Sequence, residues 1–220
     1  MKPSIYLILL LSTTILFPVI VGLVRLRRIK RSGYQPFFYL LVLGVVMELL
    51  NSFLIKVLHV HNVVAVNIFQ LFEWLLIAWQ FRVWGLLRNQ NVLFNVLLIV
   101  PCLVWVVEYL VFGQIWFFAP YFQVLYCFLI VMLSVNSINF MITHDYRNLF
   151  GNPTFLICIA FIVYFIYRIV VCWAYQTSLK GPTDTTSFIL SLNSYVNALT
   201  NVIFGIALIR IPQPQKFTLK

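Results

Sequence analysis

Charge is what this 220-residue sequence has least of. Charged residues make up 9% of the chain and only five are acidic, whereas hydrophobic residues make up 63% and the mean hydropathy is +0.99. Soluble domains contain about 25% charged residues. A water-soluble fold of this size could neither hide so much apolar surface nor cover itself with so few charges. The composition excludes a soluble enzyme, an extended disordered chain and a secreted disulfide scaffold, and it indicates a protein solvated largely by lipid.

Cysteine motifs and long polar segments are also missing. The four cysteines all fall within apolar runs, no CxxC occurs, and no Cys/His spacing fits a zinc site. We therefore expect buried thiols that act as small hydrophobes, with no metal site and no cofactor. No gap between the apolar runs is long enough for a soluble domain, so we expect a single transmembrane domain over residues 1–220.

The apolar runs have the length of membrane spans. A helix needs about 20 mostly apolar residues to cross a hydrocarbon core of about 30 Å, and its backbone groups must pair locally. The seven predicted spans cover approximately residues 4–24, 37–60, 63–84, 92–112, 121–142, 155–175 and 187–210. The sequence thus predicts an all-α polytopic membrane protein, a seven-helix transmembrane bundle in a plasma or inner membrane.

Basic residues are distributed unevenly between the gaps. Five of them follow the first span, in Arg25–Arg31, and the third gap, the fifth gap and the C-terminal tail hold more. The remaining gaps hold only Lys2 and Lys180. Cytoplasmic loops carry an excess of Lys and Arg, so we predict the N-terminus outside and the C-terminus in the cytoplasm. This rule also accounts for the net charge of +10, and we expect no nucleic-acid partner.

Ionisable side chains inside spans are expensive and are therefore candidates for a functional site. Glu48 lies near the middle of the second span, Glu73 near the middle of the third, and Arg168 in the sixth. We expect Arg168 to face the interior and to pair with Glu73 or Glu48, with Asn193 and Asn197 completing the hydrogen bonds, in a polar pocket biased towards the outer side. The candidate ligand or pathway residues are Glu48, Asn51, Asn67, Gln70, Glu73, Arg168, Asn193 and Asn197.

Packing is the alternative explanation for polar residues in a bundle, because interhelical hydrogen bonds of Asn, Gln and Ser are common in membranes. It remains an alternative for the candidate set. It is the expectation for Asn95, Asn136 and Asn139. Glu108 and Lys56 lie near the outer ends of their spans, where we expect them to reach the membrane surface.

The length and topology resemble those of the SWEET sugar transporters, which have Asn residues on the third and seventh helices. Asn67 and Asn197 correspond to those positions, but the Pro-Gln motif of that family is missing. The resemblance therefore covers topology and not motifs. Retinal proteins, seven-helix ceramidases and G-protein-coupled receptors are not matched, because this chain lacks a seventh-span Lys, mid-membrane His or Asp ligands, and the receptor signatures.

Three functions remain open. A non-enzymatic, small-molecule-binding sensor or accessory subunit would use the polar pocket and recruit a membrane or cytoplasmic protein partner through the basic face. A small-solute transporter would line its pathway with Glu48, Glu73 and Arg168. An intramembrane lipid-modifying enzyme would need a nucleophile with a base in reach, and no Ser–His or Cys–His arrangement occurs. We therefore predict the sensor or binding function.

Overall fold

The computed structural model of the chain describes residues 11, 13–59, 62–86, 91–113, 120–144, 149–178 and 184–212. All regular elements of this part are helical. Six helices are long and apolar enough to cross a membrane, and the protein is accordingly a multi-pass integral membrane protein. They are α4 (Gln35–Lys56), α5 (Val63–Val83), α6 (Asn91–Val106) with the π-helix η2 (Val107–Val111), α7 (Pro120–His144), α8 (Pro153–Ser178) and α9 (Asp184–Arg210).

These helices confirm the second to seventh predicted spans, with boundaries that shift by a few residues. Two shifts occur at prolines. Pro36 and Pro153, which lie just before the predicted spans 37–60 and 155–175, are both in the first turn of their helices, α4 and α8. A proline is tolerated there because the first backbone N–H groups of a helix have no partner within the helix.

The first predicted span, residues 4–24, is described only in part. Its described elements are the short helix η1 (Thr13–Ile15) and α2 (Leu16–Val24). Residues 1–10 and 12 lie outside the described residues, so a seventh crossing stays a prediction. The basic run after it, which the sequence assigns to a gap, folds as the short helix α3 (Leu26–Arg31). Several loop and tail residues used for the orientation lie outside the described residues: Lys2, Arg88, Arg147, Lys180, Lys216 and Lys220.

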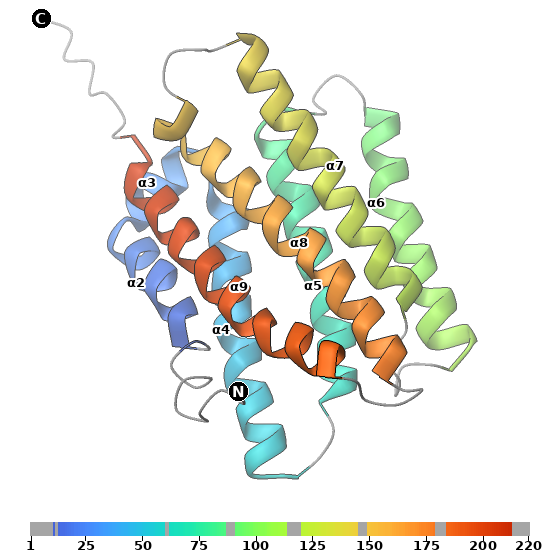
Figure 1. The fold of residues 1–220 in the computed structure, drawn as a ribbon. Coiled ribbons are helices and arrows are strands. Elements are labelled where there is room, and N and C mark those ends of the chain that lie inside the picture. Colours follow the sequence, from blue (N-terminus) through green and yellow to red (C-terminus); the bar gives the residue numbers. More distant parts are fainter. Residues whose placement is uncertain are drawn as a thin grey trace, which may run out of the picture.

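The long helices run alternately up and down and close into a ring (Figure 1). Along this ring α8 packs against both α7 and α9, α9 against α2, α2 against α4, α4 against α5, and α5 against α7. Helix α6 lies outside the ring, against α5 and α7. The ring therefore has an interior that six different helices can line.

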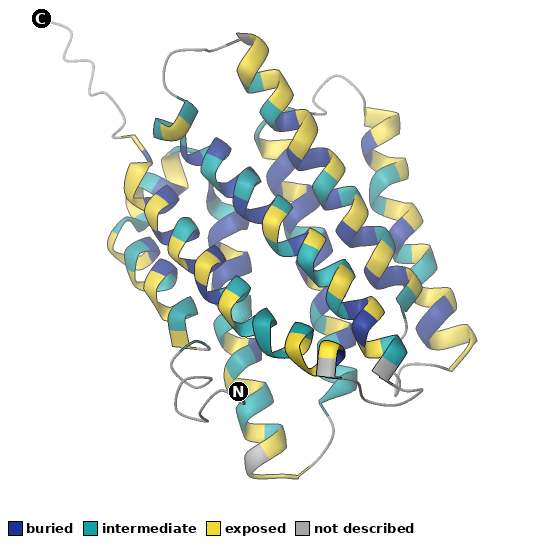
Figure 2. Ribbon diagram, viewed as in Figure 1, coloured by how far each residue is buried: buried dark blue, intermediate teal, exposed yellow. Residues whose placement is uncertain are grey.

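Exposure and polarity are inverted relative to a soluble protein. Val24, Val92 and Val111 are 82%, 79% and 69% exposed, and exposed residues follow the outward faces of the helices (Figure 2). In contrast Gln70 and Glu73 are buried. Water-soluble folds rarely leave so large an apolar surface uncovered. The outer surface of the ring is therefore suited to lipid.

Helix α2 approaches its neighbours closely at two glycines. A Cβ atom at Gly205 of α9 would overlap the ring of Phe17, and one at Gly22 would lie 2.5 Å from the ring of Phe38 in α4. Small residues at such contacts let membrane helices pack closely. Helix α2 is thus a packed member of the bundle.

Basic residues gather at one end of the bundle, which we call the basic end. Gln80, near the end of α5, accepts a hydrogen bond from the Phe37 N–H and donates one to the Gly33 carbonyl, each at 2.8 Å. The Arg25 guanidinium donates to the Ile209 carbonyl at the end of α9. The described basic residues near this end are Arg25, Arg27, Arg28, Lys30, Arg31, Arg82 and Arg210.

Candidate functional site

An ion pair crosses the interior of the ring. Arg168 of α8 donates from Nη1 to Oε2 of Glu73 in α5 at 2.7 Å, and this is the one ion pair among the described residues. The two side chains are only 13% and 6% exposed. The pair confirms the predicted Arg168–carboxylate contact, with Glu73 as the partner.

Two tyrosines complete this cluster. The Tyr126 hydroxyl of α7 donates to the same Oε2 atom at 3.0 Å, and the Tyr164 hydroxyl accepts a longer contact of 3.5 Å from Arg168 Nη1. The guanidinium carbon lies 5.8 and 5.7 Å from the two ring centroids, within range of cation–π attraction. Sequence reasoning missed both residues. Tyr164 lies one helical turn before Arg168, a spacing that could have indicated it.

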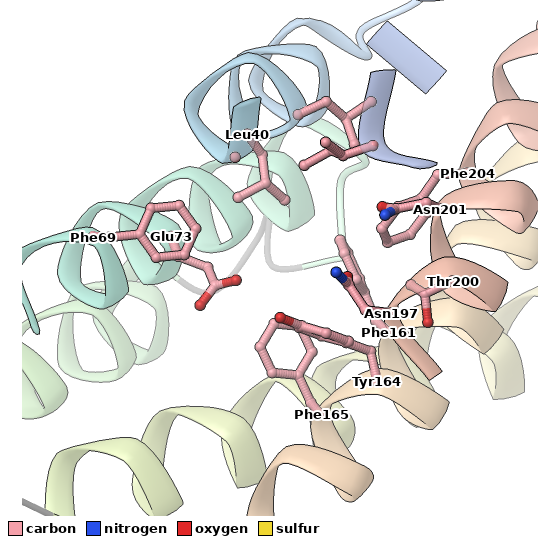
Figure 3. Close-up of a pocket in the computed structure, with 13 residues that line it drawn as sticks. Leu40, Phe69, Glu73, Phe161, Tyr164, Phe165, Asn197, Thr200, Asn201 and Phe204 are labelled. Atoms are coloured by element: carbon pink, nitrogen blue, oxygen red, sulfur yellow. The ribbon is translucent and has the colours of Figure 1, made fainter. Parts of the chain in front are cut away.

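A cavity of about 70 Å³ lies beside the ion pair, between η1, α4, α5, α8 and α9. The polar side chains that line it are those of Glu73, Tyr164, Asn197, Thr200 and Asn201, and the other lining residues are glycine, aliphatic or aromatic. The Glu73 carboxylate points into this space, which Asn197 borders from α9 (Figure 3). Both protein donors bind Oε2, and Oε1 accepts no hydrogen bond from the described residues.

The cavity extends from mid-depth towards the basic end, which corrects the predicted outward bias. Glu73 and Asn197 lie near the middle of α5 and α9, whereas Leu40 and Phe204 lie nearer the basic ends of α4 and α9. The outward bias was inferred from polar residues on the second, third, sixth and seventh spans. Of these, Asn51, Asn67, Gln70 and Asn193 do not line the cavity.

Glu48, Asn51 and Asn193 lie apart from this cluster. Asn51 Oδ1 accepts a hydrogen bond from Asn62 Nδ2 at 3.1 Å, at the turn between α4 and α5. Glu48 is half-buried and makes no hydrogen bond or ion pair within the described part of the chain. Asn193 is half-buried and is not among the residues that line the cavity. The structure therefore brings together Glu73, Arg168 and Asn197, but neither Asn193 nor Asn197 hydrogen-bonds to the ion pair as expected.

Asn67 and Gln70 connect α5 to its neighbours. Gln70 donates to Gln123 Oε1 of α7 at 3.3 Å, and the Asn67 backbone carbonyl accepts from the Trp105 indole of α6 at 3.0 Å. All four groups are buried. These contacts have the form of interhelical packing bonds, the alternative considered for the polar set.

Glu108 is buried, contrary to the expectation that it reaches the membrane surface. Glu108 is only 3% exposed. Its two carboxylate oxygens accept hydrogen bonds from the backbone N–H groups of Tyr121 and Phe122, at 2.9 and 2.6 Å. These are among the first N–H groups of α7, which have no acceptor within their own helix. A carboxylate there satisfies them and complements the helix dipole.

Three asparagines also differ from expectation. Asn95 on α6, and Asn136 and Asn139 on α7, are exposed rather than buried between helices. Asn136 and Asn139 line an open groove together with Leu93 and Leu97 of α6. The Lys56 side chain lies outside the described residues.

The described residues contain no group of three or more His, Cys, Asp and Glu that could hold a metal ion, and all four cysteines are free. Comparisons with protein-family models, with curated proteins and with solved structures find no match. The function is therefore inferred from the geometry around Glu73.

Proposed function

We propose that this protein is a non-enzymatic, small-molecule-binding membrane protein, a sensor or an accessory subunit, with its ligand in the cavity beside Glu73. One observation carries the proposal. Arg168 and Tyr126 hold one carboxylate oxygen of Glu73, and the Glu73 side chain lines a cavity that Asn197 also lines. A buried ionisable group in a membrane bundle is a functional-site hypothesis by default.

The lining favours a small solute with hydrogen-bond donors. Glu73 Oε1 is an acceptor, and the Asn197 amide can both donate and accept. The Arg168 guanidinium already neutralises the carboxylate, so a neutral solute needs no further countercharge. Aromatic residues such as Phe161 and Phe204 supply apolar walls around these polar groups, as is common in ligand pockets.

A binding function fits this lining better than catalysis. The described cavity wall contains no cysteine or histidine. The Thr200 hydroxyl donates to the Val196 carbonyl of its own helix at 2.8 Å.

Helix α9 offers a route from the cavity to the basic end. Asn201, in the cavity wall, donates to Thr14 Oγ1 at 3.1 Å, and the end of α9 accepts a hydrogen bond from Arg25. We infer that a ligand-induced shift of α9 would change the position of α2 and α3, where a membrane or cytoplasmic partner could read it.

We also infer seven crossings, with the N-terminus outside and the C-terminus in the cytoplasm, from the basic residues gathered at one end. Reporter fusions at the two termini test this. An odd number of crossings places the two termini on opposite sides of the membrane. Reporter signals from the same side would contradict seven crossings.

Thermal unfolding of the purified protein against a panel of small polar solutes tests the binding function. A ligand of this cavity raises the midpoint of the wild type but not of Glu73→Gln or Asn197→Leu, because binding to the folded state stabilises it. Asn193→Leu is the matched control, an asparagine of the same helix that does not line the cavity. If every solute that raises the unfolding midpoint of the wild type also raises that of Glu73→Gln and Asn197→Leu, this site is refuted.

Transport is the second candidate, and the mid-depth position of Glu73 inside a ring of helices favours it, because transporter sites lie near the bilayer midplane. Flux into proteoliposomes separates the two functions. Solute movement that Glu73→Gln and Arg168→Leu abolish, while the folded state persists, would replace the sensor proposal with transport.

A further inference from the structure

The break between α2 and α3 forms a groove at the basic end, separate from the cavity beside Glu73. Arg25 lies between the two helices with φ −103° and ψ 16°, outside helical geometry. The groove has a volume of about 520 Å³. We call it the elbow groove, and it is lined by Leu23, Val24, Arg25, Leu26, Arg27 and Arg28.

The elbow groove is fixed to the bundle. Ile29 of α3 is fully buried, and its carbonyl accepts from the Tyr34 N–H at 3.3 Å. The Arg25 carbonyl accepts from the Arg28 and Ile29 N–H groups at 2.9 and 3.1 Å. The groove is therefore a built feature with a defined shape.

Its chemistry changes along its length. Leu23 and Val24, at the end of α2, are 57% and 82% exposed and are apolar. Arg27 is exposed and Arg28 half-exposed, just beyond them. None of the three groove arginines forms an ion pair with an acidic residue in the described part of the chain. An apolar surface next to unneutralised cations matches the boundary between acyl chains and head groups.

We propose that the elbow groove binds the head group of an anionic phospholipid in the leaflet at the basic end. The phosphate lies between Arg27 and Arg28, since guanidinium groups bind phosphate oxygens in a bidentate manner. One acyl chain lies along Leu23 and Val24. Basic pockets at the ends of transmembrane helices bind anionic head groups in this way.

The position of the elbow groove gives the lipid a structural consequence. The Arg25 guanidinium donates to the Ile209 carbonyl, so the groove is joined to the end of α9. A lipid bound there stabilises the contact of α2 with α9.

Binding in nanodiscs tests the proposal. The full-length protein is placed in phosphatidylcholine discs with increasing phosphatidylglycerol, and native mass spectra report the retained lipid. The wild type should retain phosphatidylglycerol in preference to phosphatidylcholine. Arg27→Gln/Arg28→Gln should weaken that binding on the order of 25-fold, because each cation near a membrane surface contributes about a factor of five.

Lys30→Gln/Arg31→Gln is the matched control. It removes the same charge from the same short helix, at positions that do not line the groove. Because Lys30 and Arg31 do not line the groove, and exposed charges at a distance from the phosphate are screened by salt, the proposal expects this pair to weaken binding by only a few-fold. Equal losses in the two double variants, or no lipid preference in the wild type, would overturn the site and leave only a diffuse basic surface.

Two further experiments distinguish a lipid site from a site for a free anion and provide a second variant. Inorganic phosphate added at the concentration of the lipid should not compete, because it lacks the acyl chain that contacts Leu23 and Val24. Effective competition would assign the groove to a free anion instead. If the double variant fails to fold in phosphatidylcholine, Arg27→Gln alone, at an exposed position, takes its place, and unchanged lipid retention by it would reject the proposal.

Discussion

Arg168 and Glu73 are 95 positions apart in the sequence, yet their side chains meet at 2.7 Å inside the ring of helices. Neither charge has another ionic partner within the described part of the chain. Removing one partner of a buried ion pair leaves an uncompensated charge, whereas removing both does not. The pair therefore makes a clear prediction for stability.

Arg168→Leu should lower the free energy of unfolding by about 3–5 kcal/mol, or prevent folding, because the buried Glu73 carboxyl group loses its charged partner. Arg168→Leu/Glu73→Leu should recover most of this loss. Thermal unfolding in detergent measures both. Arg82→Gln removes an exposed arginine and is the control. A double variant no more stable than Arg168→Leu would contradict the pairing argument.

Tyr126→Phe should destabilise the protein more than Tyr164→Phe. The Tyr126 hydroxyl donates to the ionised carboxylate at 3.0 Å, and a hydrogen bond to a charged group contributes about 1.5–3 kcal/mol. Tyr164 makes only a 3.5 Å contact with Arg168. Chemical unfolding of the two variants tests the order, and the reverse order would show that the shorter contact is not the stronger one.

Glu108→Ala should loosen the start of α7 and cost about 0.5–2 kcal/mol, because the N–H groups of Tyr121 and Phe122 lose their acceptor. Glu108→Gln keeps an acceptor oxygen and should cost less. Hydrogen exchange of these two amides reports the effect locally. Unchanged protection in Glu108→Ala would argue against a capping role.

Gly205→Val should displace α2 from α9, since the added side chain overlaps the Phe17 ring. We expect a loss of about 1–3 kcal/mol, as for other overpacked contacts. Phe17→Ala should partly rescue Gly205→Val by opening space. Val202→Leu adds bulk to an exposed face of the same helix and should have little effect. An equal loss of stability in Gly205→Val and Val202→Leu would contradict the contact between Gly205 and Phe17.

The sequence predicted the six long spans closely because the thickness and apolar character of the bilayer set their length and composition. A span such as 63–84 needs only enough consecutive apolar residues, and α5 covers Val63–Val83. The ion pair was also predictable in outline, since a lone Arg168 in lipid is too costly to leave unpaired.

The environment of the remaining polar residues depended on helix rotation and register. Glu108 looked accessible from its position near the end of a span, but the start of α7 covers it. Asn95 and Asn136 resemble interhelical residues in sequence and are nevertheless exposed. Tyr126 could not be recognised as a polar residue of the site from the sequence, because its aromatic ring suits an apolar core. Only the position of Glu73 in the structure shows what its hydroxyl binds.

Apolar length, a local property of the chain, determined by itself that this protein resides in a membrane and, to within a few residues, where its six long helices lie. The tertiary structure alone selected Glu73 over Glu48 as the partner of Arg168, placed the cavity beside Asn197, and formed a groove from the basic run. Those outcomes follow from which helices are neighbours and which face each presents, and such long-range geometry is fixed only when the whole ring packs.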